Sequence, residues 1–269
     1  MPTALEQHLS IRPCDTPLAR DLFRQPPFRG LIVITQALKN FYKEMFPELL
    51  NRIWVVPDAA DPPPYGAPDF ELATIGDFRV GYAGHLYPGK GAEIILQLAQ
   101  RLPHVGFHVL GGYEKDVAVW RSKARGLFNI VFYGFRPQRE VSAFLRQLDV
   151  VVAPYLRQVD VYGGGNDIAA WMSPLKLFEY MAHELPIVSS DLPVLREVLK
   201  DQENALLCDP DDIGAWVSAI ERLRLDDQLR AALARRASED FALLYTWEKR
   251  VQRILRPLLA RDDGVTADR

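Results

Sequence analysis

The stretch RVGYAGHLYPGKGAEIILQLAQRL, residues 79–102, decides the fold. Residues 79–83 form a short apolar run followed by glycine, which predicts a buried strand. A glycine-rich turn follows at residues 84–91, and residues 91–102 then repeat apolar side chains at helical spacing. A strand, a glycine-rich turn and a helix in this order are typical of a sheet of parallel strands with crossover helices.

The same alternation continues along the chain. Further strands are predicted at residues 106–110, 129–133, 149–153, 186–189 and 205–208. Further helices are predicted at residues 116–125, 140–148, 174–183, 194–199, 211–224, 226–238 and 246–259. Short apolar runs that alternate with helices predict an α/β fold with a Rossmann-like, doubly wound parallel sheet. Ligands of such sheets bind beyond the carboxyl ends of the strands.

Few helices and strands are predicted at the beginning of the chain. It offers a strand at residues 31–35, a helix at 39–46 and a strand at 53–56. The segment DAADPPPYGAPD, residues 58–69, holds three consecutive prolines, which marks a linker or a domain edge. Because an independent α/β domain needs roughly 100 residues, we expect the start of the chain to be the end of a domain whose beginning is absent. The expected division is a remnant at 1–57, a linker at 58–77, a Rossmann-like domain at 78–259 and a polar tail at 260–269.

Composition narrows the class of protein. Hydrophobic residues make up 48% and charged residues 25% of the 269 residues, as in ordinary globular proteins. The net charge of −3 gives no electrostatic reason to bind nucleic acid. Two cysteines, Cys14 and Cys208, do not make a disulfide framework, which indicates a reducing, cytoplasmic location. No apolar run approaches the roughly 20 residues that cross a bilayer, and the N-terminus has no signal-peptide pattern.

The glycine-rich turn GHLYPGKG, residues 84–91, suits an anion such as a diphosphate. Glycines let backbone N–H groups approach the anion, the start of the following helix favours negative charge, and Lys90 adds a positive charge. The turn also nearly matches the P-loop of nucleoside triphosphatases. Gly91, however, stands where that motif has the Ser or Thr that holds magnesium. A plain tight turn with one solvated lysine remains an alternative.

The helix that follows Ser173 carries Lys176 and Glu179 on one face, because the two residues are three apart. We expect Ser173 to cap this helix, Pro174 to occupy its first turn and Leu175 to pack on the sheet. A carboxylate near such a helix start can accept both hydroxyls of a ribose, and a lysine there can meet a pyrophosphate. The alternative is a surface ion pair between Lys176 and Glu179.

Together these segments resemble glycosyltransferase family 4 of the GT-B fold, in which two Rossmann-like domains face each other. The resemblance covers residues 31–258. VGYAGHLYPGKG resembles the family's strand and its G-R-L-x-x-x-K-G turn, in which two basic residues contact the donor diphosphate. Lys90 matches one of these residues, and His85, mostly neutral at pH 7, stands in place of the arginine.

SPLKLFEYMAHELPIVSSDLP resembles the region around the family's E-x7-E motif. Glu179 falls on the second glutamate, which binds the nucleotide ribose in the family, and Trp171 falls on the first, which contacts the donor sugar. The chain resembles a subset with S-P-L-K here, which implies sugar contacts from Asn166 or Asp167 and from the backbone of residues 173–175. Three adjacent glycines just before Asn166 could let this loop close over a ligand, and a disordered connection is the alternative.

Other segments resemble the base site and the other domain. HVLGG and VFYGF resemble further strands of the donor domain, and Phe135 and Arg136 would lie by the base. LIVITQALKNFY resembles the last strand and helix of the acceptor domain, IWVVPDAAD resembles the hinge, and Glu6 and His8 would belong to the preceding strand. The family's acceptor-side glycine-rich loop and its histidine near the sugar are expected to have no counterpart.

The resemblance implies a retaining, hexosyltransferase-type enzyme that moves a sugar from a UDP-, GDP- or ADP-sugar to an acceptor hydroxyl, without cofactor or metal. The residues expected to act in catalysis are Lys90, Lys176 and Glu179. Those expected to bind the donor are Gly84, His85, Gly89, Gly91, Gly112, Phe135, Asn166, Asp167, Ser173, Pro174 and Leu175. The chain alone is expected to bind nucleotide and to transfer little. The alternatives are a non-catalytic module that binds a nucleotide sugar or a partner, and a P-loop-like nucleoside triphosphatase.

A missing domain also implies partners. Its interface would be exposed around residues 31–57 and the C-terminal helices, which predicts homo-association or a protein that supplies the absent half. The acceptor, a glycan or a lipid-linked sugar, stays open. Arginines of the C-terminal helices could touch an anionic membrane at its surface, and a solvated helix face is the alternative. These arginines are Arg235, Arg236, Arg250 and Arg253.

Overall fold

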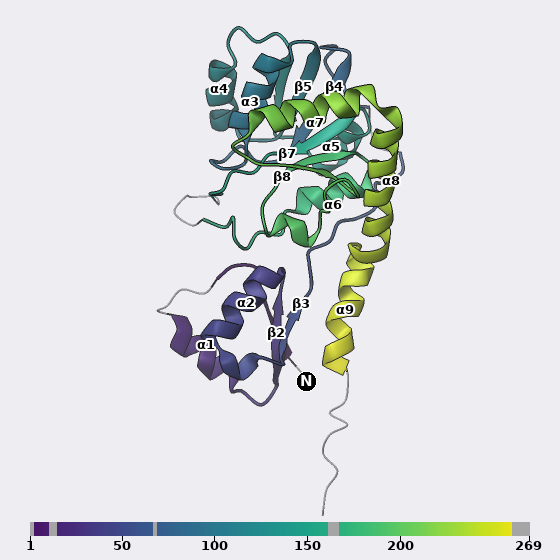
Figure 1. Ribbon diagram of the computed structural model, residues 1–269. Helices are drawn as coiled ribbons and strands as arrows, with labels where there is room; N and C mark the ends of the chain where they lie inside the picture. The colour runs from purple at the N-terminus through teal and green to yellow at the C-terminus, as the bar shows by residue number, and fades with distance from the viewer. Residues whose placement is uncertain (1–2, 11–14, 67–68, 161–166, 260–269) are drawn as a thin grey trace, which may run out of the picture.

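The computed structural model describes residues 3–10, 15–66, 69–160 and 167–259. Its strands form two sheets, each in a lobe of its own (Figure 1). The large lobe holds a six-stranded sheet with helices α3 to α8, and the small lobe holds a three-stranded sheet with α1 and α2. Helix α9 (Trp247–Leu259) leaves the large lobe and runs beside the small one.

The large sheet is parallel, with the strand order β6-β5-β4-β7-β8-β9. Its strands are β4 (Phe78–Ala83), β5 (Val105–Leu110), β6 (Ile130–Gly134), β7 (Val150–Ala153), β8 (Ile187–Ser190) and β9 (Leu206–Cys208). The order reverses between β4 and β7, and doubly wound sheets bind their ligands at such a switch point. The doubly wound parallel sheet that the sequence predicts is confirmed.

Helices cover both faces of this sheet. They are α3 (Ala92–Arg101), α4 (Glu114–Lys123), α5 (Gln138–Leu145), α6 (Leu175–Ala182), α7 (Ile213–Leu225) and α8 (Asp227–Leu244). Val150 and Val152 belong to one core together with α3 and α7, whereas Val151 and Ala153 belong to the opposite core with α5 and α6. Strands buried on both faces read as continuous apolar runs, which is why the sequence pattern located them.

The small lobe is a parallel sheet in the order β1-β2-β3, formed by β1 (Thr3–Gln7), β2 (Phe28–Val33) and β3 (Ile53–Val55). Its helices are α1 (Thr16–Phe23), α2 (Gln36–Met45) and the 3-10 turn η2 (Pro47–Leu49). They enclose a core that includes Leu38, Tyr42 and Phe46. The sequence analysis does not predict α1. Glu6 lies in β1 as expected, and His8 lies just beyond its end.

Local expectations around α6 are wrong. Pro174 is the N-cap residue with extended backbone, and no side chain caps the helix. The hydroxyl of Ser173 instead accepts a hydrogen bond from the N–H of Asp58, at 3.4 Å. The side chain of Leu175 is 51% exposed rather than packed on the sheet. A separate expectation, an α-helix at residues 194–199, is replaced by the 3-10 turn η3 (Leu195–Glu197).

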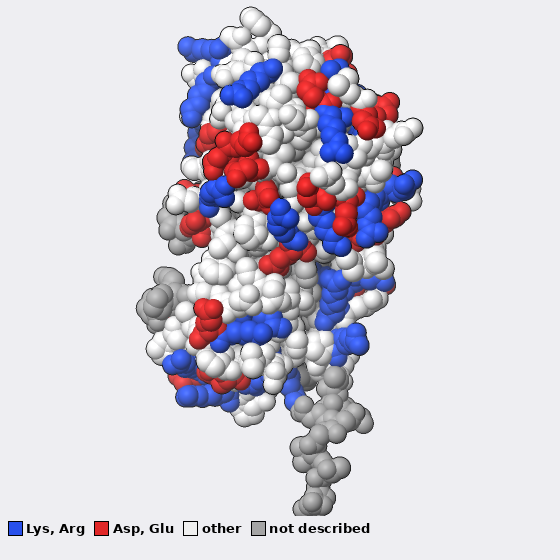
Figure 2. All heavy atoms as spheres, in the orientation of Figure 1, with Lys and Arg blue, Asp and Glu red and all other residues white. Residues whose placement is uncertain are grey.

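The surface gives little support for membrane contact through arginines. Within the described residues, no helix is both long and apolar enough to cross a membrane. The face drawn in Figure 2 carries acidic and basic side chains intermixed. Among the arginines expected to reach a membrane, Arg250 is buried and Arg236 pairs with Asp240 at 3.0 Å. The expectation is therefore wrong for Arg250, which points into the molecule.

Candidate functional site

A cavity of about 550 Å³ lies at the switch point, with walls from both lobes. The large lobe contributes the ends of β4 and β5 and the start of α6, and the small lobe contributes His8, Leu9 and Ile34. The predicted site residues in its wall are Gly84, His85, Lys90, Gly112, Phe135, Ser173, Pro174, Leu175, Lys176 and Glu179. Segments that are distant in the sequence thus meet at one place.

The glycines of the turn after β4 are required by close packing. Gly89 and Gly91 have φ of +81° and +90°, a region that L side chains rarely adopt. A Cβ on Gly89 would lie 2.0 Å from the carbonyl oxygen of Gln158, and one on Gly91 would lie 1.7 Å from that of Pro154. Gly89 and Gly91 shape the turn but are not part of the cavity wall. The P-loop alternative loses support, because no Ser or Thr fits at Gly91.

Two lysines converge on the cavity. The ammonium of Lys176 is buried 3.8 Å from the ring centre of Tyr82 and 4.9 Å from that of Tyr155, and Lys90 lies 5.3 Å from the Tyr155 ring centre. Burial, with the charge of Lys90, holds the pKa of Lys176 well below its usual value. Burial also lowers the pKa of Lys90. Neither lysine makes an ion pair within the described residues, so the surface ion pair of Lys176 with Glu179 is wrong.

The carboxylate of Glu179 is held by a neighbour that the sequence analysis does not single out. Its Oε1 accepts a hydrogen bond from Gln138, the first residue of α5, at 2.8 Å. Burial raises the pKa of Glu179 above its ordinary value, against the opposing effects of Gln138 and Lys176. Glu179 and Gln138 both line the cavity, and the hydrogen bond from Gln138 engages only one of the two carboxylate oxygens.

The ring of His85 stacks on an aromatic neighbour. The neighbour is Tyr87, with ring centroids 4.8 Å apart, and Tyr82 donates its hydroxyl proton to the His85 carbonyl at 2.6 Å. Burial, followed by the charges of Lys90 and Lys176, lowers the pKa of His85. The lowered pKa favours the neutral imidazole at pH 7, so His85 adds little charge to a wall whose other basic side chains are Lys90, Lys176 and Arg136.

Asp167 and Trp171, which the sequence singled out, are not part of the cavity wall. Asp167 accepts the backbone N–H groups of Val159 and Ala169, both at 2.9 Å, so its carboxylate holds the loop together. Trp171 packs against the small lobe rather than facing the cavity. Asn166 and the three glycines before it lie outside the described residues.

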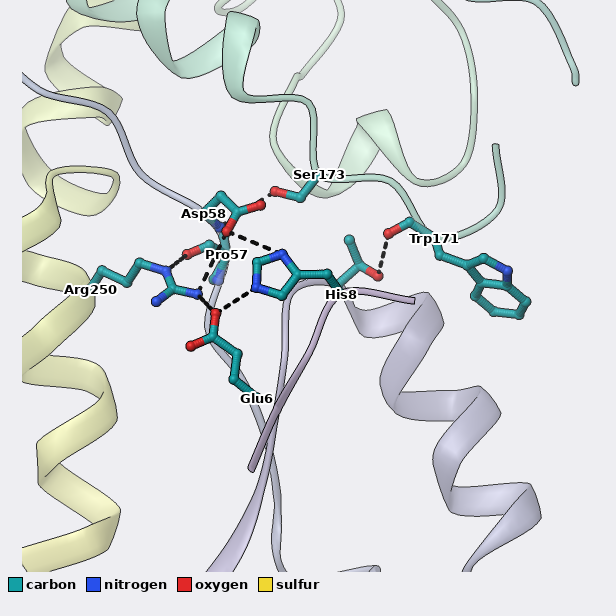
Figure 3. Close-up of polar contacts among 8 residues, drawn as sticks. Glu6, His8, Pro57, Asp58, Trp171, Ser173 and Arg250 are labelled. Atoms are coloured by element: carbon teal, nitrogen blue, oxygen red, sulfur yellow. Dashed lines mark hydrogen bonds and ion pairs between the residues drawn. The ribbon is translucent and has the colours of Figure 1, made fainter. Parts of the chain in front are cut away.

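The small lobe brings a charged cluster to the cavity that the sequence analysis did not assemble (Figure 3). His8 lies 2.7 Å from Glu6 and 3.9 Å from Asp58, and Arg250 of α9 bonds to Glu6 and lies 3.6 Å from Asp58. Burial raises the pKa of Asp58, whereas hydrogen bonds from Arg250 and His8 outweigh burial and lower the pKa of Glu6. His8 of the N-terminal segment thus lines the cavity, a position that the sequence did not predict for it.

The same cluster is the one grouping of described residues whose His and carboxylate atoms could hold a metal ion. The guanidinium of Arg250 already lies between the carboxylates of Glu6 and Asp58. It also donates to the carbonyl of Pro57 at 3.1 Å. A cation therefore already balances these acids, and the donor set fits an ion-pair joint between the lobes better than a metal site.

The sequence matches a known family. The model described as glycosyl transferases group 1 matches residues 77–226, more than half of the chain. The D-inositol 3-phosphate glycosyltransferase of Corynebacterium urealyticum is 27% identical over 248 residues, which are 84% of this chain and 55% of that protein. The phosphatidyl-myo-inositol mannosyltransferase of Mycolicibacterium smegmatis is 31% identical over 157 residues, which are 56% of this chain and 37% of that protein. The chain thus spans about half or less of the length of these relatives.

Solved structures agree on the fold. The structure of Anabaena HepE, in complex with UDP and glucose, aligns with a TM-score of 0.72 and 18% identity. The alignment covers 96% of this chain and 72% of that chain. At this identity the likeness shows the fold, so the GT-B expectation holds for the architecture of both sheets.

Proposed function

Because the chain belongs to the family of glycosyl transferases group 1, we propose that it is the donor-binding half of a retaining hexosyltransferase. The reaction moves a sugar from a nucleoside diphosphate sugar to an acceptor hydroxyl. One observation supports the donor assignment most directly. The ammonium of Lys176 is buried beside Lys90 without a hydrogen-bond partner among the described residues. Such a buried cation is costly unless a ligand pairs with it, and a diphosphate at the switch point would do so.

Each group of the cavity has a task in this proposal. Lys90 and Lys176 stabilise the negative charge that develops on the leaving diphosphate, without a bound metal. Glu179, oriented by Gln138, accepts the hydroxyls of the ribose. The backbone of residues 173–175 contacts the donor sugar, and Phe135, exposed at the cavity wall, lies beside the base.

The test is the thermal stability of the full chain with UDP, GDP, ADP and ATP and their sugars, each with magnesium or with a chelator. A ligand at 100 times its Kd adds about 2.7 kcal/mol of stability. We expect one nucleoside diphosphate to stabilise the chain without magnesium. The stabilisation should disappear in Lys90→Met and Glu179→Gln and persist in Lys200→Met, which changes an exposed lysine.

The other outcomes distinguish the alternatives. Stabilisation only by a triphosphate with magnesium would support a triphosphatase, against the lack of room at Gly91. Binding of a nucleotide sugar with no transfer, even when an acceptor half is supplied, would support a non-catalytic module. Trp171, which stands where the family contacts the sugar through a glutamate, is the observation that keeps this second candidate. No response to any nucleotide would contradict the proposal.

We also propose that a second copy of the chain docks on an apolar stripe of α8 and α9. Apolar residues recur there at every fourth position, beside a small sheet whose edge strands are β1 and β3. These residues, each 43–68% exposed, are Leu243, Trp247, Val251, Leu255 and Leu259. Such a stripe indicates a contact surface. We expect light scattering to show that the isolated chain pairs with a second copy and that Leu255→Glu is a monomer, and a wild-type monomer would contradict this.

A further inference from the structure

The side chain of Trp171 joins the two lobes. Its ring meets Phe41 of α2 edge-on, with centroids 5.1 Å apart at 61°, and it packs against the core of the small lobe. Its carbonyl oxygen accepts the hydroxyl proton of Thr35, at 3.2 Å. Both contacts cross from the loop before α6 in the large lobe to α2 in the small lobe, one at its N-cap Thr35 and one at Phe41 in its middle.

A second contact of the large lobe holds the same helix start. The carboxylate of Glu197 accepts the backbone N–H of Gln36 at 2.6 Å and that of Ala37 at 3.0 Å. These are first-turn N–H groups that have no partner within their own helix, and an anion is favoured there. The start of α2 is thus bound by Glu197 and by the backbone of Trp171, and the ring of Trp171 contacts the middle of the same helix at Phe41.

This joint is adjacent to the donor cavity. Trp171 precedes Ser173 by two residues, and Ser173 is tied to the hinge by the N–H of Asp58, at 3.4 Å. Lys90, Lys176 and Glu179, which we assign to the diphosphate and the ribose, all belong to the large lobe. His8 and Ile34 of the small lobe wall the rest of the cavity. A change in the position of the small lobe would therefore alter the contacts to the part of the donor beyond the diphosphate.

We propose that Trp171 is a positioning residue that clasps the small lobe onto the large one and thereby sets the affinity for the donor sugar rather than for the nucleotide. In the family that this chain resembles, a glutamate stands at this position. In this chain, Trp171 stands there and makes contacts between the two lobes. This inference rests on the proposed function for its ligand, but the clasp itself is a contact between lobes that can be measured without ligand.

The test compares the full-length wild type with Trp171→Ala, Trp171→Phe and Glu197→Gln. Titration calorimetry uses UDP and UDP-glucose as probes, or the nucleotide that stabilises the chain best. In Trp171→Ala we expect the affinity for the nucleotide sugar to fall about tenfold, within the usual range of coupling between sites, and that for the diphosphate to change less than about twofold. Trp171→Phe keeps an aromatic ring for Phe41 and should bind like the wild type.

Hydrogen exchange on the same proteins tests the clasp without ligand. Trp171→Ala and Glu197→Gln should both speed exchange in α2 and in residues 172–175, while β5 at the centre of the large lobe stays protected. Unchanged exchange in α2, or equal loss of affinity for both ligands, would overturn the inference. If the wild type binds no nucleotide but the exchange result holds, the proposed function fails and the clasp stands.

Discussion

The two lobes become stable in different ways. The large lobe covers both faces of its sheet with its own helices and has two extensive cores. The small lobe has one smaller core on a three-stranded sheet, and Trp171, Glu197 and α9 hold it from outside. Three strands with an apolar face packed on helices are close to the minimum for independent stability. A substitution inside the large lobe should therefore unfold the whole chain, whereas one at the joint should release only the small lobe.

The largest effect is expected for Gly91→Ser, which also creates the complete P-loop pattern. The new Cβ would lie 1.7 Å from the Pro154 carbonyl oxygen at a φ of +90°, so β7 and the turn must move apart. We expect a loss of more than about 3 kcal/mol in the free energy of unfolding, and no gain of magnesium-dependent ATP binding. Urea unfolding followed by circular dichroism measures the loss.

Gly126→Ala is the matched control for that change. Gly126 has the same φ of +90°, but nothing lies within 4 Å of the position that its Cβ would take. Only the backbone strain remains, which costs about 1–2 kcal/mol. Equal losses in the two variants would show that strain, and not the contact with Pro154, requires Gly91.

Removal of the buried arginine at the joint should have an effect of similar size. Arg250→Met leaves Asp58 buried without its guanidinium, and such a loss costs about 3–5 kcal/mol. Hydrogen exchange should rise in β2 and α2 while β5 stays protected. Arg157 makes three hydrogen bonds to Asp209 and Asp211 but lies exposed, so Arg157→Met should leave unfolding unchanged. Loss of protection in β5 of Arg250→Met would contradict the separate behaviour of the lobes.

The difference between the lobes also explains what could be predicted from the sequence. Each strand of the large sheet is within one residue of its predicted bounds, because buried parallel strands are apolar runs closed by glycine or proline. In the small lobe, β1 is partly exposed and α1 has eight residues, so neither gives a long periodic signal. The sequence analysis places Glu6 in β1 only through a family resemblance.

Some residues of the candidate site could likewise be predicted from the sequence, and others could not. Lys90, Lys176 and Glu179 lie in local patterns of turn and helix, and the sequence sufficed to select them as candidates. Gln138 and His8 reach the cavity through tertiary packing, which one sequence does not reveal. Ser173 was expected to cap its own helix, but its hydroxyl is taken by Asp58, 115 residues away in the chain. Asp167 is likewise used by nearby backbone N–H groups.

Acid should destabilise the large lobe in part through His108. Burial, followed by the charge of Arg79, lowers the pKa of His108 from 6.5 to about 4, and its Nδ1 bonds to the Tyr133 hydroxyl at 2.9 Å. Because the unfolded chain binds this proton more tightly, the contribution of His108 is complete above pH 6.5 and falls as the pH drops toward 4. The loss between pH 7.5 and pH 5 should be about 2 kcal/mol.

Urea unfolding of the wild type and of His108→Gln at these two pH values measures that loss. Glutamine does not titrate and can still accept the Tyr133 hydroxyl, so the variant should lose about 2 kcal/mol less than the wild type on acidification. A parallel fall in the wild type and His108→Gln would contradict the assignment.

The smallest expected effect is a gain, not a loss, in the free energy of unfolding. The comparison uses one lysine from each lobe. Lys176→Met replaces a buried ammonium that has no hydrogen-bond partner among the described residues by an apolar chain of similar length. Without ligand, we expect the variant to be more stable by about 1 kcal/mol, because desolvation of the charge is relieved, and to lose nucleotide binding. Lys39→Met on α2 changes a half-buried lysine with no such role and should alter stability by less than about 0.5 kcal/mol. Destabilisation by Lys176→Met would mean that the rings of Tyr82 and Tyr155 compensate the buried charge, and the cavity would then not require an anion.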